Sequence, residues 1–102
     1  MLNQIVLVGR ITKTPEIIEN QDGSKFAILN LAIPRTFKNE KGEYDTDFID
    51  CALWKGIAEN TCNYVKKGDI VGIRGRIQNV NNTAQLQIVA EKVTFLSNRK
   101  ES

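Results

Sequence analysis

The sequence contains no histidine, so it lacks the side chain that most often serves as a general base or a transition-metal ligand. Cysteine is limited to Cys51 and Cys62, which have ten residues between them and are too sparse for structural zinc. We interpret both as small buried apolar residues and expect a reduced, cytoplasmic setting. The sequence shows no nucleophile paired with a general base and no cluster of ligand residues. We therefore expect neither an enzyme nor a bound cofactor or metal.

An excess of one charge and long apolar runs are missing as well. The sequence contains 14 Lys and Arg residues and 12 Asp and Glu residues. The resulting formal net charge of +2 gives only a weak attraction to a polyanion. Any binding of nucleic acid must therefore depend on where the cations lie. No apolar run approaches the ~20 residues that cross a bilayer, and the first residues lack the pattern of a secretion signal. We expect a soluble protein.

The chain has the size and composition of one ordinary globular domain. It has 102 residues, of which 41% are hydrophobic and 25% are charged. This length suits a single compact unit, and this composition is unlike that of disordered or fibrous chains. We expect residues 1–97 to form the domain and residues 98–102 to form a polar C-terminal end.

Five segments have the alternating or β-branched pattern of strands. They are Leu2–Ile11, Phe26–Phe37, Asp45–Trp54, Ile70–Val80 and Gln85–Leu96. Between the third and fourth segments, Ile57, Thr61 and Val65 are four residues apart, which indicates a short helix over residues 57–67 that ends before Gly68. This order predicts an all-β fold, the five-stranded OB-fold Greek-key barrel with one short helix between strands 3 and 4. The main rival, a small sandwich, would need about seven strands and no helix there.

Strand alternation predicts which aromatic side chains face outward. If the apolar residues of Ile49–Leu53 enter the barrel, the alternate set of the third strand faces solvent. That set is Phe48, Asp50, Ala52 and Trp54. Phe48 and Trp54 would then lie about 20 Å apart on one surface. In the second strand, Phe37 projects beyond the last clearly inward residue, Ile33.

Cations accompany these aromatic residues. The candidates for contacts with phosphate are Arg10, Arg35, Lys38, Lys55, Arg74 and Arg76. Exposed aromatic rings flanked by cations are typical of proteins that bind single strands without sequence preference, where stacking contributes about 1 to 3 kcal/mol per base. The alternative is that Phe48 and Trp54 close the barrel ends as half-buried core residues.

The first strand is apolar on both faces. Ile5 and Leu7 share one parity with Ile11, and Val6 and Val8 have the other. A small barrel buries only one face of a strand, so we expect the second face to meet another copy of the chain. The expected interface residues are Leu2, Ile5, Val6, Leu7 and Val8. The alternative is a central strand covered by the chain's own loops.

Two further features have ordinary explanations. Asp45 and Asp47 share a face while Asp50 takes the other, so parity argues against a joint metal site. Gly72 and Gly75 lack the Lys-Ser or Lys-Thr pair of a phosphate-binding loop. We expect these glycines to allow barrel bending or close backbone approach.

Several longer segments together form a pattern more specific than any one of them. They are LNQIVLVGRI at 2–11, Pro15-Glu16, LAIPRTF at 31–37, DFIDCALW at 47–54, Ala58-Glu59-Asn60, YVKKG at 64–68 and Gly75-Arg76-Ile77. On these residues the chain resembles bacterial and bacteriophage single-stranded DNA-binding proteins over nearly its whole length.

The resemblance implies an OB-fold homotetramer that protects single-stranded DNA during replication, recombination and repair, in the cytoplasm of a bacterium or phage-infected host and near the nucleoid. The family's stacking positions correspond to Phe37, Phe48 and Trp54. Its fourth stacking aromatic lies in the hairpin between strands four and five, where this chain has only Asn79-Val80-Asn81-Asn82-Thr83. We therefore expect a smaller site or weaker binding. The choice between dimer and tetramer, and the binding of RNA, stay open.

The C-terminal end departs from the family pattern. The family usually carries a flexible tail whose acidic tip recruits other replication proteins, whereas this sequence ends at Arg99-Lys100-Glu101-Ser102. Either a tail has been removed, or the chain coats DNA without recruiting partners through such a tip. The competing hypothesis for the whole chain is an OB-fold protein-interaction module of a primosome-like assembly, which bridges partners.

Overall fold

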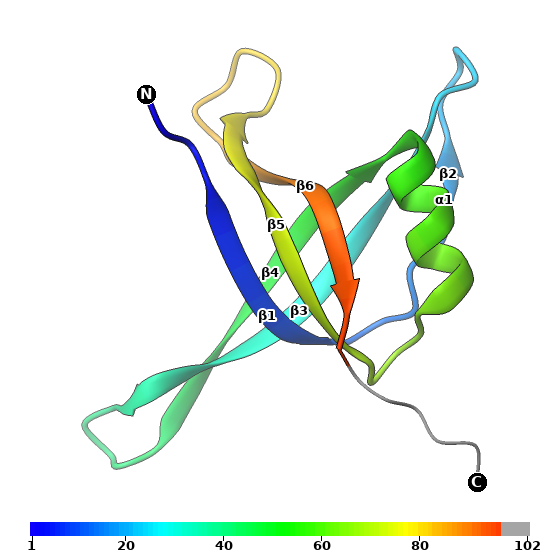
Figure 1. The fold of residues 1–102 in the computed structure, drawn as a ribbon. Coiled ribbons are helices and arrows are strands. Elements are labelled where there is room, and N and C mark those ends of the chain that lie inside the picture. Colours follow the sequence, from blue (N-terminus) through cyan, green and yellow to red (C-terminus); the bar gives the residue numbers. More distant parts are fainter. Residues whose placement is uncertain (97–102) are drawn as a thin grey trace, which may run out of the picture.

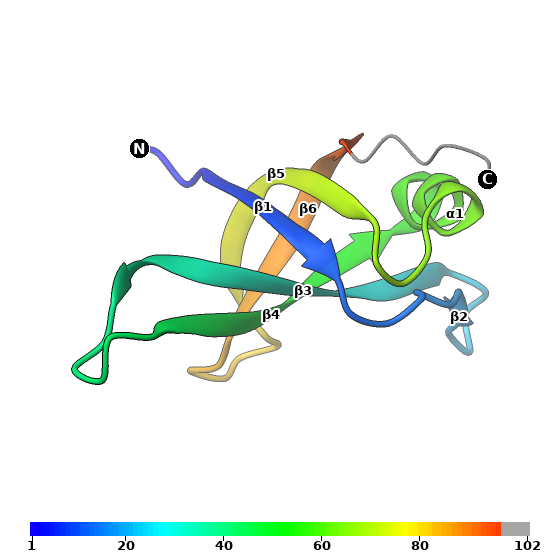
Figure 2. The same cartoon turned by 90° about the horizontal axis from the view of Figure 1, so that it is seen from below.

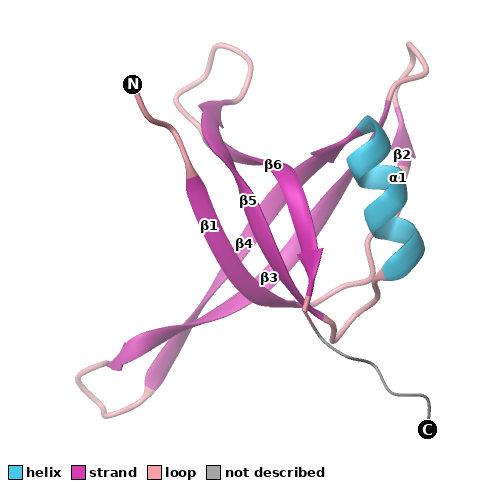
Figure 3. Cartoon of the chain, in the orientation of Figure 1, coloured by secondary structure: helices cyan, strands magenta, loops and turns pink. Residues whose placement is uncertain are grey.

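The computed structural model describes residues 1–96, which form six strands and one helix (Figures 1 and 3). The elements are β1 (Ile5–Ile11), β2 (Ile18–Glu19), β3 (Lys25–Lys38), β4 (Tyr44–Trp54), α1 (Lys55–Tyr64), β5 (Ile70–Asn79) and β6 (Leu86–Phe95). The five expected strands are present, with ends within three residues of the predicted ones. The polar end expected at residues 98–102 lies outside the described residues.

The added strand β2 is the one element that the sequence pattern did not indicate. It consists of two residues, Ile18 and Glu19, which pair with Phe26 and Lys25 of β3. The turn between them is held by Asp22, whose carboxylate accepts hydrogen bonds from the backbone and the hydroxyl of Ser24. Because β2 is counted, the helix between the third and fourth long strands lies between β4 and β5.

The sheet closes into a barrel. Its strand order is β1-β5-β6-β4-β3-β2, and an additional β1–β3 pairing joins the two ends of the five long strands. The β4–β6 pairing is parallel and the other pairings are antiparallel. Closure removes open sheet edges along the paired parts of the strands, and this topology is the predicted OB-fold.

The barrel interior contains most of the residues that alternation places inward. Fully buried side chains include Ile11, Leu29, Leu31, Leu53, Val71 and Ile73. Ala52 has the outward parity that was predicted, but the expectation that it faces solvent was wrong, because it is only 2% exposed. Its single methyl group lies beside the larger Ile28, its cross-strand partner, in a groove described below.

The β3–β4 hairpin is longer than the barrel. Its tip extends past the body of the molecule at the end remote from α1 (Figures 1 and 2). The ladder becomes irregular between Pro34 and Lys38, where proline lacks the N–H that regular pairing needs. Gly42, with a φ of 79°, forms the turn at the tip. The extension leaves this hairpin exposed on both of its faces.

The helix α1 lies beside the β2–β3 turn at the other end of the barrel (Figure 1) and buries Ala58 and Thr61. It begins two residues earlier and ends three residues earlier than predicted. It ends early because Val65 is extended and the N–H of Lys66 donates to the Asp69 carboxylate, 3.0 Å away. Gly68 then takes the left-handed φ of 97° and its N–H donates to the carbonyl of Ile11. Within residues 1–96 no helix is long and apolar enough to span a membrane.

Candidate nucleic-acid interface

The outward face of the β3–β4 pair presents aromatic residues near both ends. Its cross-strand pairs are Phe26–Trp54, Ile28–Ala52, Asn30–Asp50 and Ala32–Phe48. Residues opposite one another in an antiparallel pair share a face, so these eight side chains form one surface. We call it the β3–β4 outer face.

Phe48 is the most open aromatic residue of this face. Its side chain is 75% exposed, and it lines a groove of about 500 Å³ between the β3–β4 outer face and the β5–β6 hairpin. Ile28 and Ala52 contribute to the groove from the face itself, and Leu86 and Ile88 contribute from β6. An exposed apolar ring beside an apolar groove has no structural partner in the described chain, and it suits a planar ligand.

Trp54 lies at the other end of the face and is 38% exposed. Its ring packs against the ring of Phe26, with the centroids 5.2 Å apart and the planes tilted by 34°. Both aromatic rings predicted from parity therefore lie outside the barrel interior. The sequence reasoning missed Phe26, although its parity opposite the inward Ala27 and Leu29 was a signal for its outward position.

A second hollow of about 250 Å³ adjoins the β3–β4 outer face near β2. Lys13, Pro15 and Ile18 line it from one side, and Ile28 and Asn30 line it from β3. Ile28 lines both hollows, so both border the β3–β4 outer face at this residue. Lys13 supplies a cation there that the sequence reasoning did not select.

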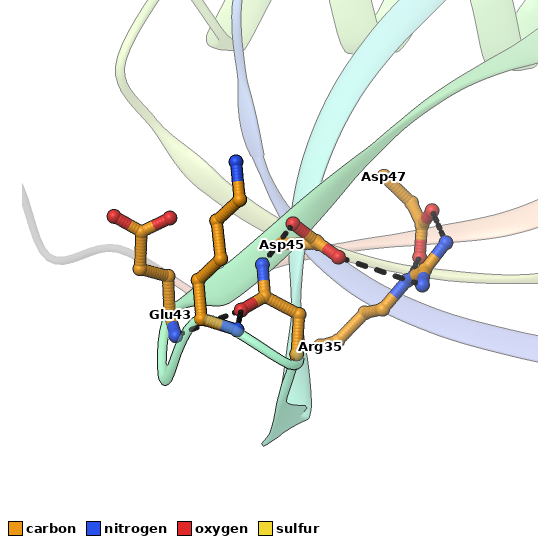
Figure 4. Close-up of polar contacts among 6 residues, drawn as sticks. Arg35, Glu43, Asp45 and Asp47 are labelled. Carbon is orange, nitrogen blue, oxygen red and sulfur yellow. Dashed lines mark hydrogen bonds and ion pairs between the residues drawn. The ribbon is translucent and has the colours of Figure 1, made fainter.

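Phe37 lies elsewhere. Arg35 donates from Nε and Nη2 to the two carboxylate oxygens of Asp47, at 3.1 and 3.0 Å, and its Nη1 is 3.9 Å from Asp45 (Figure 4). The guanidinium is also 5.9 Å from the centroid of the Phe37 ring. Since Asp47 alternates with Phe48, this cluster occupies the opposite face of the hairpin. One copy of the chain does not bring Phe37 onto the surface that carries Phe48.

The Arg35–Asp47 pair also affects the charge available for phosphate. The hydrogen bonds from Arg35 lower the pKa of Asp47, and those to Asp47 raise the pKa of Arg35. The folded state therefore favours the ionised carboxylate. The contribution of the pair to stability is present at neutral pH and disappears as the pH falls through the lowered Asp47 pKa.

The other predicted cations differ in their surroundings. Arg76 donates to the Glu91 carboxylate at 2.9 Å, and Arg10 donates to the backbone carbonyl of Gly68 at 2.8 Å. Lys38 lies 5.8 Å from the ring centroid of Tyr44. Lys55 directly follows Trp54 in the chain. Of the six, Lys55 is therefore the cation placed next to a candidate stacking residue on the β3–β4 outer face.

Arg74 belongs to a different surface. It lies opposite Val6 of β1 and Lys92 of β6, on the outward side of the β1-β5-β6 sheet. Val6 and Val8 are 67% and 52% exposed on this side. Ile5 and Leu7 are partly buried on the other parity, and Leu7 packs against the core. The predicted interface set is thus divided, with the open apolar surface made by the two valines and the exposed Leu2 that precedes the strand.

The described residues offer no metal centre. Among residues 1–96 no three His, Cys, Asp or Glu side chains gather in a way that could hold an ion. Burial, with a smaller effect from the Asp50 charge, raises the pKa of the Cys51 thiol to about 11. Cys62 was expected to be buried but is only partly buried, and this partial burial also raises its pKa. Both thiols are therefore neutral at physiological pH and poor nucleophiles.

Comparisons with known proteins agree with this geometry. The model of the Single-strand binding protein family matches residues 2–96. A single-stranded DNA-binding protein of Bacillus cereus is 41% identical, with the alignment covering 97% of this chain and 62% of the relative. Single-stranded DNA-binding protein A of Bacillus subtilis is 44% identical, with 94% and 60% covered. The chain thus spans about three fifths of the length of these relatives.

Solved structures show the same fold. The crystal structure of the wild-type single-stranded DNA binding protein from Thermus aquaticus aligns with a TM-score of 0.79 and 25% identity. The alignment covers 96% of this chain and 52% of that protein. A deletion mutant of the same Thermus aquaticus protein aligns with a TM-score of 0.76.

Proposed function

The chain belongs to the single-strand binding protein family, and on this premise we propose that it binds and protects single-stranded DNA during replication, recombination and repair. The observation that carries the proposal is the exposed Phe48 ring beside an open groove, on the same face as Trp54. A sequence-tolerant site needs aromatic rings because every base has a stacking face. The relatives named above support DNA as the ligand.

We assign base stacking to Phe48, Trp54 and Phe37. Phe48 and Trp54 hold bases on the β3–β4 outer face, and Phe37 holds a base where the strand passes the projecting hairpin. The assigned phosphate contacts are Arg10, Arg35, Lys38, Lys55, Arg74 and Arg76. Arg35 and Arg76 must then exchange a carboxylate partner for phosphate, which makes their net contributions smaller.

The β5–β6 hairpin limits the size of the site. Residues 80–85 between these strands contain no aromatic side chain, so the hairpin cannot add a stacking platform. Asn81 and Asn82 instead take left-handed conformations, with φ values of 30° and 60°, and form a short turn. We therefore propose a smaller footprint on DNA than a long aromatic hairpin would provide.

A titration with oligo-dT tests the proposed function. Trp54 is the only tryptophan, so the fluorescence change reports on one position of the site. We expect quenching on binding and an affinity that falls with salt, with a logarithmic slope of about −0.7 per neutralised phosphate. An unchanged emission together with no measurable binding in a gel-shift assay would favour the alternative, an interaction module that bridges proteins.

We also propose that the chain forms a homotetramer in the bacterial or phage-infected cytoplasm, using Leu2, Ile5, Val6, Leu7 and Val8. The two exposed valines of β1 support this because single chains rarely leave a strand open on an apolar face. We expect light scattering at micromolar concentration to give a multiple of the 11.5 kDa chain mass.

Substituting Val8→Lys is expected to reduce that mass to one chain, because four copies would bury unpaired cations. The matched control is Ile17→Lys, which adds the same charge at an exposed apolar residue outside β1. A wild-type chain that is monomeric under these conditions would contradict the assembly, and the measured mass separates a dimer from a tetramer.

A further inference from the structure

Trp54 is the last residue of β4, at a point where the pairing of the barrel strands ends. The Phe26–Trp54 pair is the final one of the β3–β4 ladder, and the parallel pairing of β4 with β6 stops at Ala52. After Trp54 the chain turns directly into α1, with Lys55 in a left-handed conformation at a φ of 51°. In the part of the chain that the structure describes, Phe26 is therefore the one cross-strand partner of Trp54.

Phe26 has an apolar neighbour on each of its two flanks. Its ring packs against the Trp54 ring, with the centroids 5.2 Å apart and the planes tilted by 34°. On the other flank it pairs with Ile18 of β2, which is 46% exposed. Cross-strand partners share a face, so these three side chains form a row across β2, β3 and β4 on one side of the sheet.

The exposed fractions of the aromatic rings indicate different roles. Phe26 is partly buried, with Ile18 and Trp54 on its flanks. Trp54 is 38% exposed and Phe48 is 75% exposed. A base stacks on an open ring face, and Phe26 offers less of one than either of these two rings. The contact between Phe26 and Trp54 has a centroid distance that is favourable for aromatic pairs, so Phe26 is placed to hold the Trp54 ring.

We propose that Phe26 is a positioning residue, which fixes the orientation of the Trp54 ring before a strand of DNA arrives. The inference rests on the proposed binding of single-stranded DNA. A side chain that is free to change its conformation loses this freedom when a base stacks on it, and the loss weakens binding. Because Phe26 restricts the Trp54 ring in the free protein, part of this cost is absent when DNA binds.

A fixed orientation matters more because one strand must reach two stacking residues. Phe48 and Trp54 are six residues apart in β4, which corresponds to about 20 Å along an extended strand. Once a base stacks on Phe48, the next contact of the same DNA strand is intramolecular, and its strength depends on the geometry of the second platform. A Trp54 ring held by Phe26 keeps that geometry constant.

The first measurement is the freedom of the Trp54 ring in the protein without DNA. Trp54 is the only tryptophan, so its emission reports on this ring alone. Phe26→Leu keeps an apolar side chain in β3 but removes the aromatic contact. We expect this variant to lower the fluorescence anisotropy of Trp54 and to increase its quenching by acrylamide. Phe26→Tyr keeps the aromatic ring and is expected to retain the wild-type values.

The second measurement is the affinity for a labelled oligo-dT. We expect Phe26→Leu to weaken binding by about two- to tenfold, which corresponds to the cost of immobilising one side chain, and Phe26→Tyr to restore most of the affinity. Phe95→Leu is the matched control. Phe95 forms a tilted aromatic pair with Tyr64, with the centroids 5.8 Å apart, and lines neither hollow of the β3–β4 outer face. Its substitution should leave the affinity within about twofold of the wild type.

A double-mutant cycle separates positioning from direct contact with DNA. The cycle combines Phe26→Leu with Trp54→Leu and measures the affinity of the wild type, both single variants and the double variant. If Phe26 acts through Trp54, Phe26→Leu causes no further loss of affinity once Trp54 has been replaced. Thermal unfolding midpoints without DNA check that each variant is folded.

The outcomes separate the inference from the proposed function. An undiminished loss from Phe26→Leu in the Trp54→Leu background would overturn the inference, because Phe26 would then act on DNA directly or through the fold. Unchanged anisotropy and acrylamide quenching in Phe26→Leu would overturn it as well, and in both cases the binding of DNA by the wild type would stand. If the wild type binds no oligo-dT, the proposed function fails and the positioning role fails with it.

Discussion

Substituting Phe48→Ala is expected to weaken oligo-dT binding by roughly 5- to 150-fold, the equivalent of about 1 to 3 kcal/mol for one lost stacking platform. The fold should be unaffected, because the Phe48 side chain is 75% exposed and removing it leaves no internal cavity. Fluorescence anisotropy of a labelled oligonucleotide measures the affinity without relying on the nearby Trp54. A thermal melt of the same sample checks that the fold is retained.

The matched control for this experiment is Tyr64→Ala. Tyr64 is also an exposed aromatic residue, but it ends α1 and packs against Phe95, with the ring centroids 5.8 Å apart. It lines neither hollow of the β3–β4 outer face. Its loss should leave the affinity for oligo-dT within about twofold of the wild type, since no stacking platform is removed. Equal losses in the two variants would show that binding does not depend on the face identified here.

The largest effect on stability is expected from Gly75→Ala in β5. An added methyl group would overlap the backbone carbonyl oxygen of Val89 and lie 2.9 Å from its carbonyl carbon. The overlap cannot be relieved by rotating a side chain, because the neighbouring atoms belong to the backbone of β6. The β5–β6 pairing shifts register between Arg74 and Gly75, so the close approach is part of how the barrel bends. We expect a loss of about 3 kcal/mol in the free energy of unfolding.

Gly72→Ala, in the same strand, provides the comparison. The methyl group added there would meet the side chain of Leu96 at 3.4 Å, an ordinary contact. Chemical denaturation of the two variants should therefore give a midpoint near the wild type for Gly72→Ala and a much lower midpoint for Gly75→Ala. Similar midpoints would mean that β6 moves away from β5 without cost, contrary to the packing described here.

Phe48 illustrates what alternation alone can establish. Its outward position followed from the inward parity predicted for Ile49 and Cys51, since neighbouring residues of a strand face opposite ways. The same rule placed Ala52 outward and was wrong about its exposure, because exposure also depends on the size of the neighbours. A methyl group beside Ile28 is covered, whereas a phenyl ring extends past the residues around it.

The alternation of residues along the sequence could not predict which residues pair across strands. The pairing of Phe26 with Trp54 and of Asn30 with Asp50 depends on the register of β3 against β4. That register follows from the length of the hairpin and from the irregularity between Pro34 and Lys38. The periodicity of a short stretch of sequence reveals neither of these. The hydrogen bond from Arg35 to the Asp47 carboxylate also depends on the register of β3 against β4. The sequence alone thus identified cations without showing which of them are held by carboxylates.

The amino-acid sequence by itself determined the five long strands, the helix, most of the inward residues and the barrel class, because each depends on the periodicity of neighbouring residues along the chain. Tertiary structure alone decided which outward side chains share a surface. It joined Phe48 to a groove completed by β6, moved Phe37 to the opposite face of the hairpin, and packed Phe26 against Trp54. The physical reason is that a shared surface is set by barrel closure and strand register, which bring together residues far apart in the chain.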